Sequence, residues 1–432
     1  MAPLDPLLVT ILMFSAMFGL MVIGLPLTFS LGIVSVGTVL FLWGAGGIDM
    51  MFHAAFGVSY SFALTAVPPF IFMGIVLSKS GIGDDFFEMI YKWMGRTPGG
   101  LGIGVILVCA IMAAMVGQTG PATLTMGLIA LPAMLQRGYD KRMVTGAIQA
   151  GGALGILIPP SVTMIIIAYL SRQSAGRLFA AGIFPGLLLT GLFMAYIFIR
   201  CRIQPHLGPP VPPEERYSWK EKFISLKALV LPGILIFLVL ALILLGVTSP
   251  TEAAGVGAAG SLACAALHRN LTWRVLKDSV LTTGNLMGLL FWIIIPAVAF
   301  SKIYHGLGAE ELILGLTESF GLSPYTVLGM MMASYYVLGM FLETAAITFL
   351  TIPLYIPIIM RLGFDPLWFG LLYVMTQESA YLTPPYGFNL FYMKAIVPKE
   401  ITMVDIYLSV VPFVGLQIIG VILVIIFPQI AL

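Results

Sequence analysis

The chain has 432 residues, of which 59% are hydrophobic and only 9% are charged, and its formal net charge at pH 7 is +2. Soluble domains carry about 25% charged residues, so this composition excludes a water-soluble fold. Roughly a dozen apolar runs approach or exceed the ~20 residues that cross a bilayer. The three cysteines and four histidines show no metal-ligand spacing. No nucleotide-binding or hydrolase motif is present, and nothing predicts an enzyme.

The apolar runs predict an all-α polytopic membrane protein. The expected spans, in chain order, are 5–24, 27–44, 61–80, 101–137, 143–170, 179–199, 228–246, 251–267, 280–301, 324–361, 366–397 and 404–427. The first has no basic residue before it and is interpreted as a retained span, not a signal peptide. The polar, proline-rich stretch 200–223 suits an exposed linker. We therefore divide the chain into a first half, 1–200, a cytoplasmic linker, 201–227, and a second half, 228–432.

Two of the runs, 101–137 and 324–361, are too long for one crossing. Each has a short polar patch at its centre, which reads GQTGPAT at 117–123 and LETAAIT at 342–348. A helical hairpin that enters partway and returns to the same face places such a patch at its tip. Irregular backbone is tolerated at that depth where protein or a wet cavity surrounds it. We therefore expect two re-entrant hairpins.

The basic residues agree with this topology. If both hairpins are re-entrant, 17 of the 21 lysines and arginines fall on one face, and the others are Arg172, Arg177, Lys302 and Arg361. The positive-inside rule makes the rich face cytoplasmic and places both termini in the periplasm. The three arginines on the poor face either attract anions or are ordinary snorkelling residues.

The second half repeats the first at an offset of 225 residues. The matches that carry information are Thr119 with Thr344, Thr123 with Thr348, Asp140 with Asp365, and Pro159–Pro160 with Pro384–Pro385. An odd number of crossings separates the hairpins, so the repeats are inverted, as in many secondary transporters. The two aspartates precede helical patterns and are expected to be N-caps rather than ligands.

The double prolines lie in GILIPPS, 155–161, and YLTPPYG, 381–387. A lone membrane proline is usually only a kink, but a double proline at matched positions favours a broken helix. Such a break exposes carbonyl groups that can hold Na⁺ and N–H groups that favour an anion. The candidate contacts of an anionic substrate are Ser161, Thr123, Thr348, Glu378 and Asn389.

Glu343 and Glu378 are the acidic residues nearest the expected membrane midplane. A carboxylate at that depth is costly and is a functional candidate by default. Three interpretations stay open for both residues. They bind Na⁺, they carry protons, or they are structural hydrogen-bonding groups that face a wet vestibule.

Four stretches carry a resemblance to a known family: LPAMLQRGYD at 131–140, GGALGILIPPS at 151–161, LFAAGIFPGLLL at 178–189, and LGFDPLWFGLLYVMTQESAYLTPPYGFNLF at 362–391. The chain resembles the large (M) subunit of TRAP transporters, the DctM-like permeases, over nearly its whole length. The resemblance implies an elevator-type carrier of the ion transporter superfamily, driven by Na⁺, in a bacterial inner membrane. It also implies two partners on separate chains, a four-helix Q subunit and a periplasmic binding protein that delivers an organic acid.

The resemblance implies two Na⁺ sites, one in each half. The first comprises Gln118, Thr119, Gly120, Gly155, Ile158 and Pro160, and the second comprises Glu343, Thr344, Ala345, Thr383, Pro385 and Gly387. The leading hypothesis is a Na⁺-coupled, binding-protein-dependent importer of an organic acid anion, either a carboxylate or a sulfonate. The alternatives are a stand-alone Na⁺- or proton-coupled carboxylate carrier, and a channel or pump subunit in which the two glutamates form a proton wire.

Overall fold

The computed structural model describes residues 5–94, 96–212, 217–308, 311–312, 315, 319–340, 342–385 and 387–431, and every regular element within these ranges is helical. The first half contains α1 (Pro6–Val22), α2 (Leu27–Trp43), α3 (Ile48–Ser59), α4 (Val67–Lys79), α5 (Ile82–Met94), α6 (Gly100–Val116), α7 (Thr119–Gln136), α8 (Lys141–Ala153), α9 (Val162–Ser171) and α10 (Ala175–Ile203). The rest contains α11 (Trp219–Ser225), α12 (Lys227–Leu244), α13 (Pro250–Leu267), α14 (Trp273–Gly306), α16 (Pro324–Gly339), α17 (Thr344–Arg361), α18 (Pro366–Ala380), α19 (Phe388–Ile396) and α20 (Met403–Ile426). Short 3₁₀ turns occur at η1 (Ala45–Gly47), η2 (Ala63–Ala66), η3 (Leu154–Ile156), η4 (Pro205–Leu207) and η6 (Pro428–Ile430).

Five stretches of helix in the described ranges are long and apolar enough to cross a membrane: α10, the run from Trp219 to Leu244, α14, α17 and α20. A sixth is added if α3 and α4, which meet at a bend of 45°, form one broken span. Shorter apolar helices, α1, α2, α6 and α9, accompany them. Fewer helices than expected cross on length and composition alone. Four of the predicted spans are each divided into two shorter helices, and α1, α2 and α4 are shorter than 18 residues.

These four divided segments are the ones that the sequence singles out. Segment 101–137 folds as α6 and α7, and segment 324–361 as α16 and α17, and the two helices of each pair contact each other. Gly117 makes the turn between α6 and α7 at φ +66°, a conformation that glycine adopts readily. Segment 143–170 divides into α8 and α9, and segment 366–397 into α18 and α19. In both cases the double proline lies in the gap, and its Pro–Pro bond is cis.

The two aspartates before the broken helices are N-caps, as predicted. The Oδ1 atom of Asp140 accepts from the backbone N–H groups of Arg142 and Met143 at 2.9 and 3.0 Å. The Oδ1 atom of Asp365 accepts from those of Leu367 and Trp368 at 2.7 and 3.1 Å. Each cap satisfies N–H groups that have no partner within the helix, and so defines where α8 and α18 begin.

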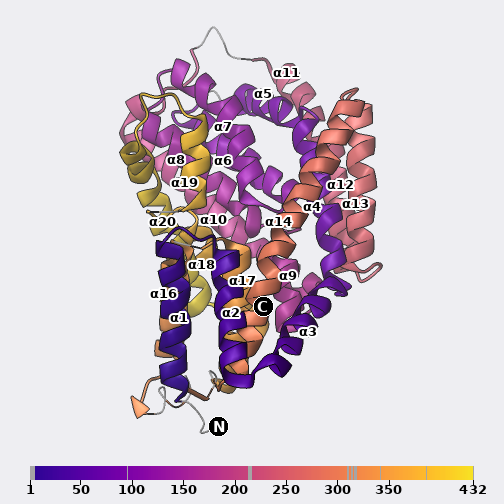
Figure 1. Cartoon of the computed structure of the whole chain (residues 1–432). Coiled ribbons are helices and arrows are strands. Elements are labelled where there is room, and N and C mark those ends of the chain that lie inside the picture. Colours follow the sequence, from indigo (N-terminus) through magenta and orange to yellow (C-terminus); the bar gives the residue numbers. More distant parts are fainter. Residues whose placement is uncertain are drawn as a thin grey trace.

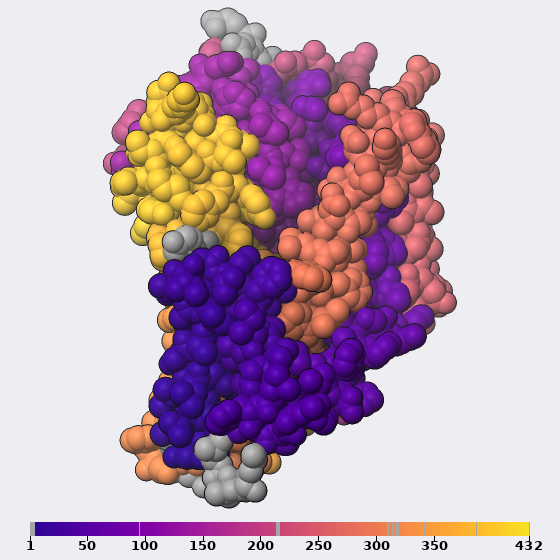
Figure 2. All heavy atoms as spheres, viewed as in Figure 1, coloured from indigo at the N-terminus to yellow at the C-terminus, as the bar shows by residue number. Residues whose placement is uncertain are grey.

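The helices of the two halves interlock. α8 contacts α6, α7 and α20, and α18 contacts α16, α17 and α20. Contacts between α7 and α19 and between α9 and α17 join the halves directly. The long α14 packs on α2, α3, α4 and α17, and in the space-filling view it runs along one face beside the indigo N-terminal helices (Figure 2).

The segment predicted to be an exposed linker is exposed only in part. The carbonyl oxygens of Leu207 and Gly208 accept from the backbone N–H groups of Asp140 and Gly99, at 3.1 and 2.7 Å. Cys201 and Gly208 are buried as a result. Residues Trp219–Ser225 form α11, which lies with α5 at the end of the molecule opposite the N-terminus (Figure 1). The segment packs on the first half because its backbone groups complete the helix ends there.

The crossing of α8 and α20 gives a test of this packing. A Cβ atom on Gly146 would fall inside van der Waals contact with the carbonyl oxygen of Ser409 and 2.8 Å from a ring carbon of Phe413. Overpacking of this kind costs about 1–3 kcal/mol, so Gly146→Ala should lower the thermal unfolding midpoint in detergent. Gly415→Ala, on α20 with no atom within 4 Å of its Cβ position, is the control and should unfold like the parent. Equal midpoints for both variants would contradict the contact.

Candidate functional site

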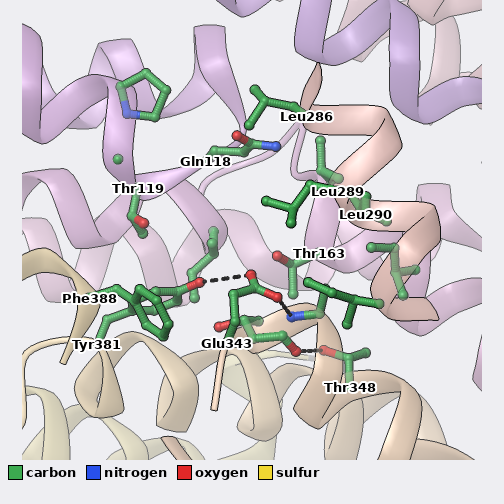
Figure 3. A pocket seen from close by; sticks show the side chains of 18 of the residues that line it. Gln118, Thr119, Thr163, Leu286, Leu289, Leu290, Glu343, Thr348, Tyr381 and Phe388 are labelled. Atoms are coloured by element: carbon green, nitrogen blue, oxygen red, sulfur yellow. Dashed lines mark hydrogen bonds between the residues drawn. The ribbon is translucent and has the colours of Figure 1, made fainter. Parts of the chain in front are cut away.

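A cavity of about 410 Å³ lies where the two hairpin tips meet (Figure 3). The first tip, 117–120, and the second tip, 342–345, face it from the two halves of the chain. Its walls come from both broken helices and from an apolar stripe of α14. The lining residues are Gln118, Thr119, Gly120, Pro121, Leu124, Ile156, Val162, Thr163, Ile166, Leu286, Leu289, Leu290, Ile293, Glu343, Thr344, Ala345, Thr348, Tyr381, Phe388 and Tyr392. Segments far apart in the sequence thus share one pocket.

The backbone of the first tip packs closely against the backbone of the first break. A Cβ atom on Gly155 would overlap the carbonyl oxygen of Gln118, and one on Gly117 would lie 2.7 Å from the carbonyl oxygen of Pro160. The backbone N–H of Val162 also donates to the Gly117 carbonyl at 3.4 Å. Only glycine permits this approach, because any side chain would fill the space that the carbonyl groups occupy. Backbone oxygens therefore gather at this junction.

Two other residues predicted for this site lie within the break itself. The Ser161 hydroxyl donates to the carbonyl oxygen of Ile156 at 2.6 Å and accepts from the backbone N–H of Met164 at 3.3 Å. It thereby caps α9, is fully buried, and does not line the cavity. The Ile158 side chain packs against Gly186 of α10, where a Cβ atom would lie 2.8 Å away. These two side chains stabilise the break on the side that does not line the cavity.

The second break also brings carbonyl groups close to a glycine, but within its own loop. A Cβ atom on Gly387 would overlap the carbonyl oxygen of Tyr381 and lie 3.0 Å from that of Thr383. The Thr383 hydroxyl donates to the Ser379 carbonyl at 2.8 Å, and the Pro385 carbonyl accepts from the Tyr407 hydroxyl at 3.1 Å. Carbonyl groups again surround a glycine. In the described ranges no group of three or more histidine, cysteine, aspartate or glutamate residues is placed to hold a metal ion.

Glu343 gives the second tip a charge that the first tip lacks. Its carboxylate accepts from the backbone N–H of Ala345 at 2.8 Å, which caps α17, and from the Tyr381 hydroxyl at 3.5 Å (Figure 3). A negative charge is favourable at a helix N-terminus. Gln118, which precedes α7 at the first tip, makes no side-chain cap on that helix. Among the described residues that line the cavity, Glu343 is the only Asp, Glu, Lys or Arg.

Glu378 lies on α18 behind the cavity and does not line it. Its side chain is fully buried, and one carboxylate oxygen accepts from the Gln417 amide at 3.1 Å. The other oxygen has no hydrogen-bond partner within the described part of the chain. Any contact of this residue with a cargo molecule would require a rearrangement of α18 and α20.

The three remaining predicted substrate contacts are divided between core and cavity. Thr123 of α7 donates to the side-chain carbonyl oxygen of Asn389 at 2.9 Å, and the Asn389 amide donates to the Gln149 carbonyl at 2.9 Å. Both side chains are fully buried and join α7, α8 and α19 away from the cavity. Thr348 does line it, and its hydroxyl donates to the Thr344 carbonyl at 2.7 Å.

Several lining residues carry no signal that sequence reasoning used. Tyr381 and Tyr392 flank the second double proline, and their position beside that motif could have identified them. The leucines of α14 could not be identified in this way, since they lie in an ordinary apolar span. Thr163 follows the first double proline closely and is the polar residue of α9 that faces the cavity (Figure 3).

The link between α7 and α19 can be tested through Thr123. In Thr123→Val the side-chain carbonyl oxygen of Asn389 loses its buried donor, and an unsatisfied buried group costs about 1–3 kcal/mol. The variant should therefore unfold at a lower temperature in detergent. Thr190→Val is the control, because within the described ranges the Thr190 hydroxyl donates only to the Gly186 carbonyl of its own helix, at 2.7 Å. A decrease of the same size in both variants would show that the Thr123–Asn389 bond adds nothing.

Comparison with known proteins agrees with this architecture. Residues 14–430 match the model of a family described as "Tripartite ATP-independent periplasmic transporter, DctM component". The C4-dicarboxylate TRAP transporter large permease DctM of Pseudomonas aeruginosa is 31% identical, over 85% of each chain. The ectoine TRAP transporter large permease TeaC of Halomonas elongata is 28% identical, over 98% of each chain. In fold alone, the chain resembles Neisseria gonorrhoeae MtrF, with a TM-score of 0.62 at 14% identity over 88% of this chain and 83% of that one. The chain therefore belongs to the DctM family of large TRAP transporter permeases, which are multi-pass membrane transporters and not enzymes.

Proposed function

We propose that this chain is the large permease subunit of a Na⁺-coupled importer of a small organic acid. It works with a small four-helix Q subunit and a periplasmic binding protein, in the inner membrane of a bacterium. Family membership supports the class of function. The observation that supports the site is the meeting of two hairpin tips and two broken helices around one cavity of about 410 Å³. Pockets for small molecules range from about 300 to 1,000 Å³.

The chemistry of the cargo is supported by the names of the relatives. The Pseudomonas aeruginosa protein is named for C4-dicarboxylates and the Halomonas elongata protein for ectoine. A carboxylate is the group that these compounds share. The N-terminus of α7, which has no side-chain cap, offers N–H groups to such a carboxylate.

We propose Na⁺ as the coupling ion, held at the two places where a tip meets a break. The carbonyl groups gathered around Gly155 and Gly387 support this proposal, since uncharged oxygens suit an alkali cation. The unwound backbone of a discontinuous helix is a common source of such ligands in transporters. On the first side the ligands would come from the tip residues Gln118, Thr119 and Gly120 together with Gly155, Ile158 and Pro160. On the second they would come from Glu343, Thr344, Ala345, Thr383, Pro385 and Gly387.

The transport step would be a movement of both hairpins and both broken helices, together, against the remaining helices. The wall that α14 contributes to the cavity supports such a sliding contact. This wall consists of Leu286, Leu289, Leu290 and Ile293. Their side chains are apolar, so no hydrogen bond between the cargo and this wall would have to break during the movement. The contacts between α7 and α19 and between α9 and α17 would keep the moving unit intact.

The first sodium site can be tested with Gly155→Ala, because the added Cβ would displace the Gln118 carbonyl. If the ion-bound state carries this cost of about 1–3 kcal/mol, Na⁺ affinity falls by roughly 5- to 150-fold. We expect the Na⁺ concentration for half-maximal uptake to rise by about that factor in proteoliposomes that also contain the Q subunit and the binding protein. Gly191→Ala, with no atom within 4 Å of its Cβ position, should behave like the parent.

Two results of this assay would contradict the proposed function. Uptake that is driven equally well by a proton gradient without Na⁺ would indicate a proton-coupled carrier. Uptake that proceeds equally well without the binding protein would indicate a stand-alone carrier with the same fold.

The orientation can be tested by labelling single cysteines with a membrane-impermeant maleimide in intact cells. The background would lack Cys109, Cys201 and Cys264, all of which are buried. We expect His206→Cys, in the linker, to be labelled only after the cells are permeabilised, because the basic residues near it favour the cytoplasm. Ser319→Cys, at an exposed position before α16, should be labelled in intact cells. The opposite pattern would place the termini in the cytoplasm.

A further inference from the structure

A second cavity, of about 320 Å³, lies where the start of α8 and the first turns of α20 meet the end of α10. It shares none of its described lining residues with the cavity between the hairpin tips. Arg142 of α8 and Arg200 of α10 line it, together with Asp140 and Tyr196. Arginine is the side chain best suited to a phosphate group, because its planar fork donates two parallel hydrogen bonds. Two arginines from different helices at one small cavity therefore indicate a site for a phosphate group.

The charges around this cavity do not cancel. The Nε atom of Arg142 donates to one carboxylate oxygen of Asp405 at 3.2 Å, and Lys141 donates to the other oxygen at 2.6 Å. Asp140 uses its carboxylate to cap α8. Arg200 makes no hydrogen bond or ion pair with any residue that the structure describes. Three cationic side chains thus accompany two carboxylates, which leaves one positive charge in excess.

Tyr196 supplies a further donor. It lies one turn before Arg200 on α10, so both side chains are on the same face of that helix. Its ring is in edge-to-face contact with Phe413 of α20, with 5.2 Å between ring centroids. Its hydroxyl makes no hydrogen bond within the described ranges. The cavity therefore offers a guanidinium group and a hydroxyl group that no protein acceptor uses.

Apolar side chains border the cavity on both α20 and α10. Leu408 of α20 lines it and is 46% exposed, and Val404, one turn earlier, is 61% exposed. On α10, Ile203 lies three residues after Arg200 and is 71% exposed. In a bilayer such side chains meet acyl chains, while arginines at the end of a span extend to the level of the headgroups. A ligand with a charged head and apolar chains matches both features.

We propose that this cavity binds the phosphodiester group of an anionic membrane lipid. The phosphate oxygens accept from Arg200, from the remaining N–H groups of Arg142 and from the Tyr196 hydroxyl, and the acyl chains lie along the exposed apolar residues of α10 and α20. A phosphodiester carries one negative charge, which matches the single positive charge in excess. Basic pockets between transmembrane helices bind lipid headgroups in this way. Lipid binding here depends on neither the cargo nor the coupling ion.

Lipid binding to the purified full-length chain can be measured by titration in native mass spectrometry. The probe is dioleoylphosphatidylglycerol, and the control lipid is dioleoylglycerol, which has the same chains but no phosphate. We expect Arg200→Gln to weaken the tightest phosphatidylglycerol binding by about tenfold, because a charge-assisted hydrogen bond is lost. Arg202→Gln is the matched control and should bind like the parent, because Arg202 lies over the Phe198 ring at 5.9 Å and does not line the cavity.

A second variant separates a bound phosphate from a general effect of charge. Tyr196→Phe keeps the ring against Phe413 and the net charge of the chain, and it should still weaken phosphatidylglycerol binding several-fold, because the hydroxyl donor is lost. Equal affinities in Arg200→Gln and Arg202→Gln would overturn the proposal. Dioleoylglycerol that binds to the parent as tightly as phosphatidylglycerol would overturn it too.

A soluble phosphate ester is the other possible source of the same chemical group. Glycerophosphoglycerol, the headgroup without its acyl chains, tests this alternative in the same titration. We expect it to bind at least about tenfold more weakly than phosphatidylglycerol, since it buries no apolar surface along α10 and α20. Equal affinity for the two compounds would show that the cavity takes a soluble phosphodiester, and the lipid assignment would be wrong.

Discussion

The close approach of the first hairpin tip to the first broken helix is the contact on which the rest of the site depends. It is possible only because glycines occupy the meeting points, where Gly117 and Gly155 approach the carbonyl groups of Pro160 and Gln118. A side chain at either position would separate the first tip from the first break. The backbone oxygens would then no longer lie close together, and the tip residues would no longer line the cavity. In the second break Gly387 approaches the carbonyl group of Tyr381 within the same loop.

The two halves of the site share backbone features and differ in their side-chain chemistry. Both halves use an aspartate cap, a double proline and a short tip, so the same backbone appears twice. The residues that begin α7 and α17 differ, because Gln118 gives no cap and Glu343 gives a carboxylate cap. Two similar backbone arrangements can therefore present different chemistry at the two tips, since one substitution at a tip changes the charge of that tip only.

Sequence reasoning located the breaks well because prolines and glycines constrain the backbone wherever they occur. The division of 101–137 at Gly117 and the gaps at both double prolines follow from those residues alone. The positions and contacts of individual side chains were harder to predict. Thr123 and Asn389 looked like polar groups free to meet a substrate, yet they are bonded to each other in the core. Their pairing spans the two halves, and an offset between repeats carries no information about which residues meet across them.

The position of the tips also bears on how ion and cargo would be coupled. At the first tip the Gln118 carbonyl points to the break while the Gln118 side chain and Thr119 line the cavity, so one short segment faces both candidate sites. A ligand that orders this segment from either side reduces the entropy cost for the other ligand. Such coupling is reciprocal, since each ligand must raise the affinity of the other by the same factor. The proposed symport would then follow from a shared rigid tip, without direct contact between sodium and cargo.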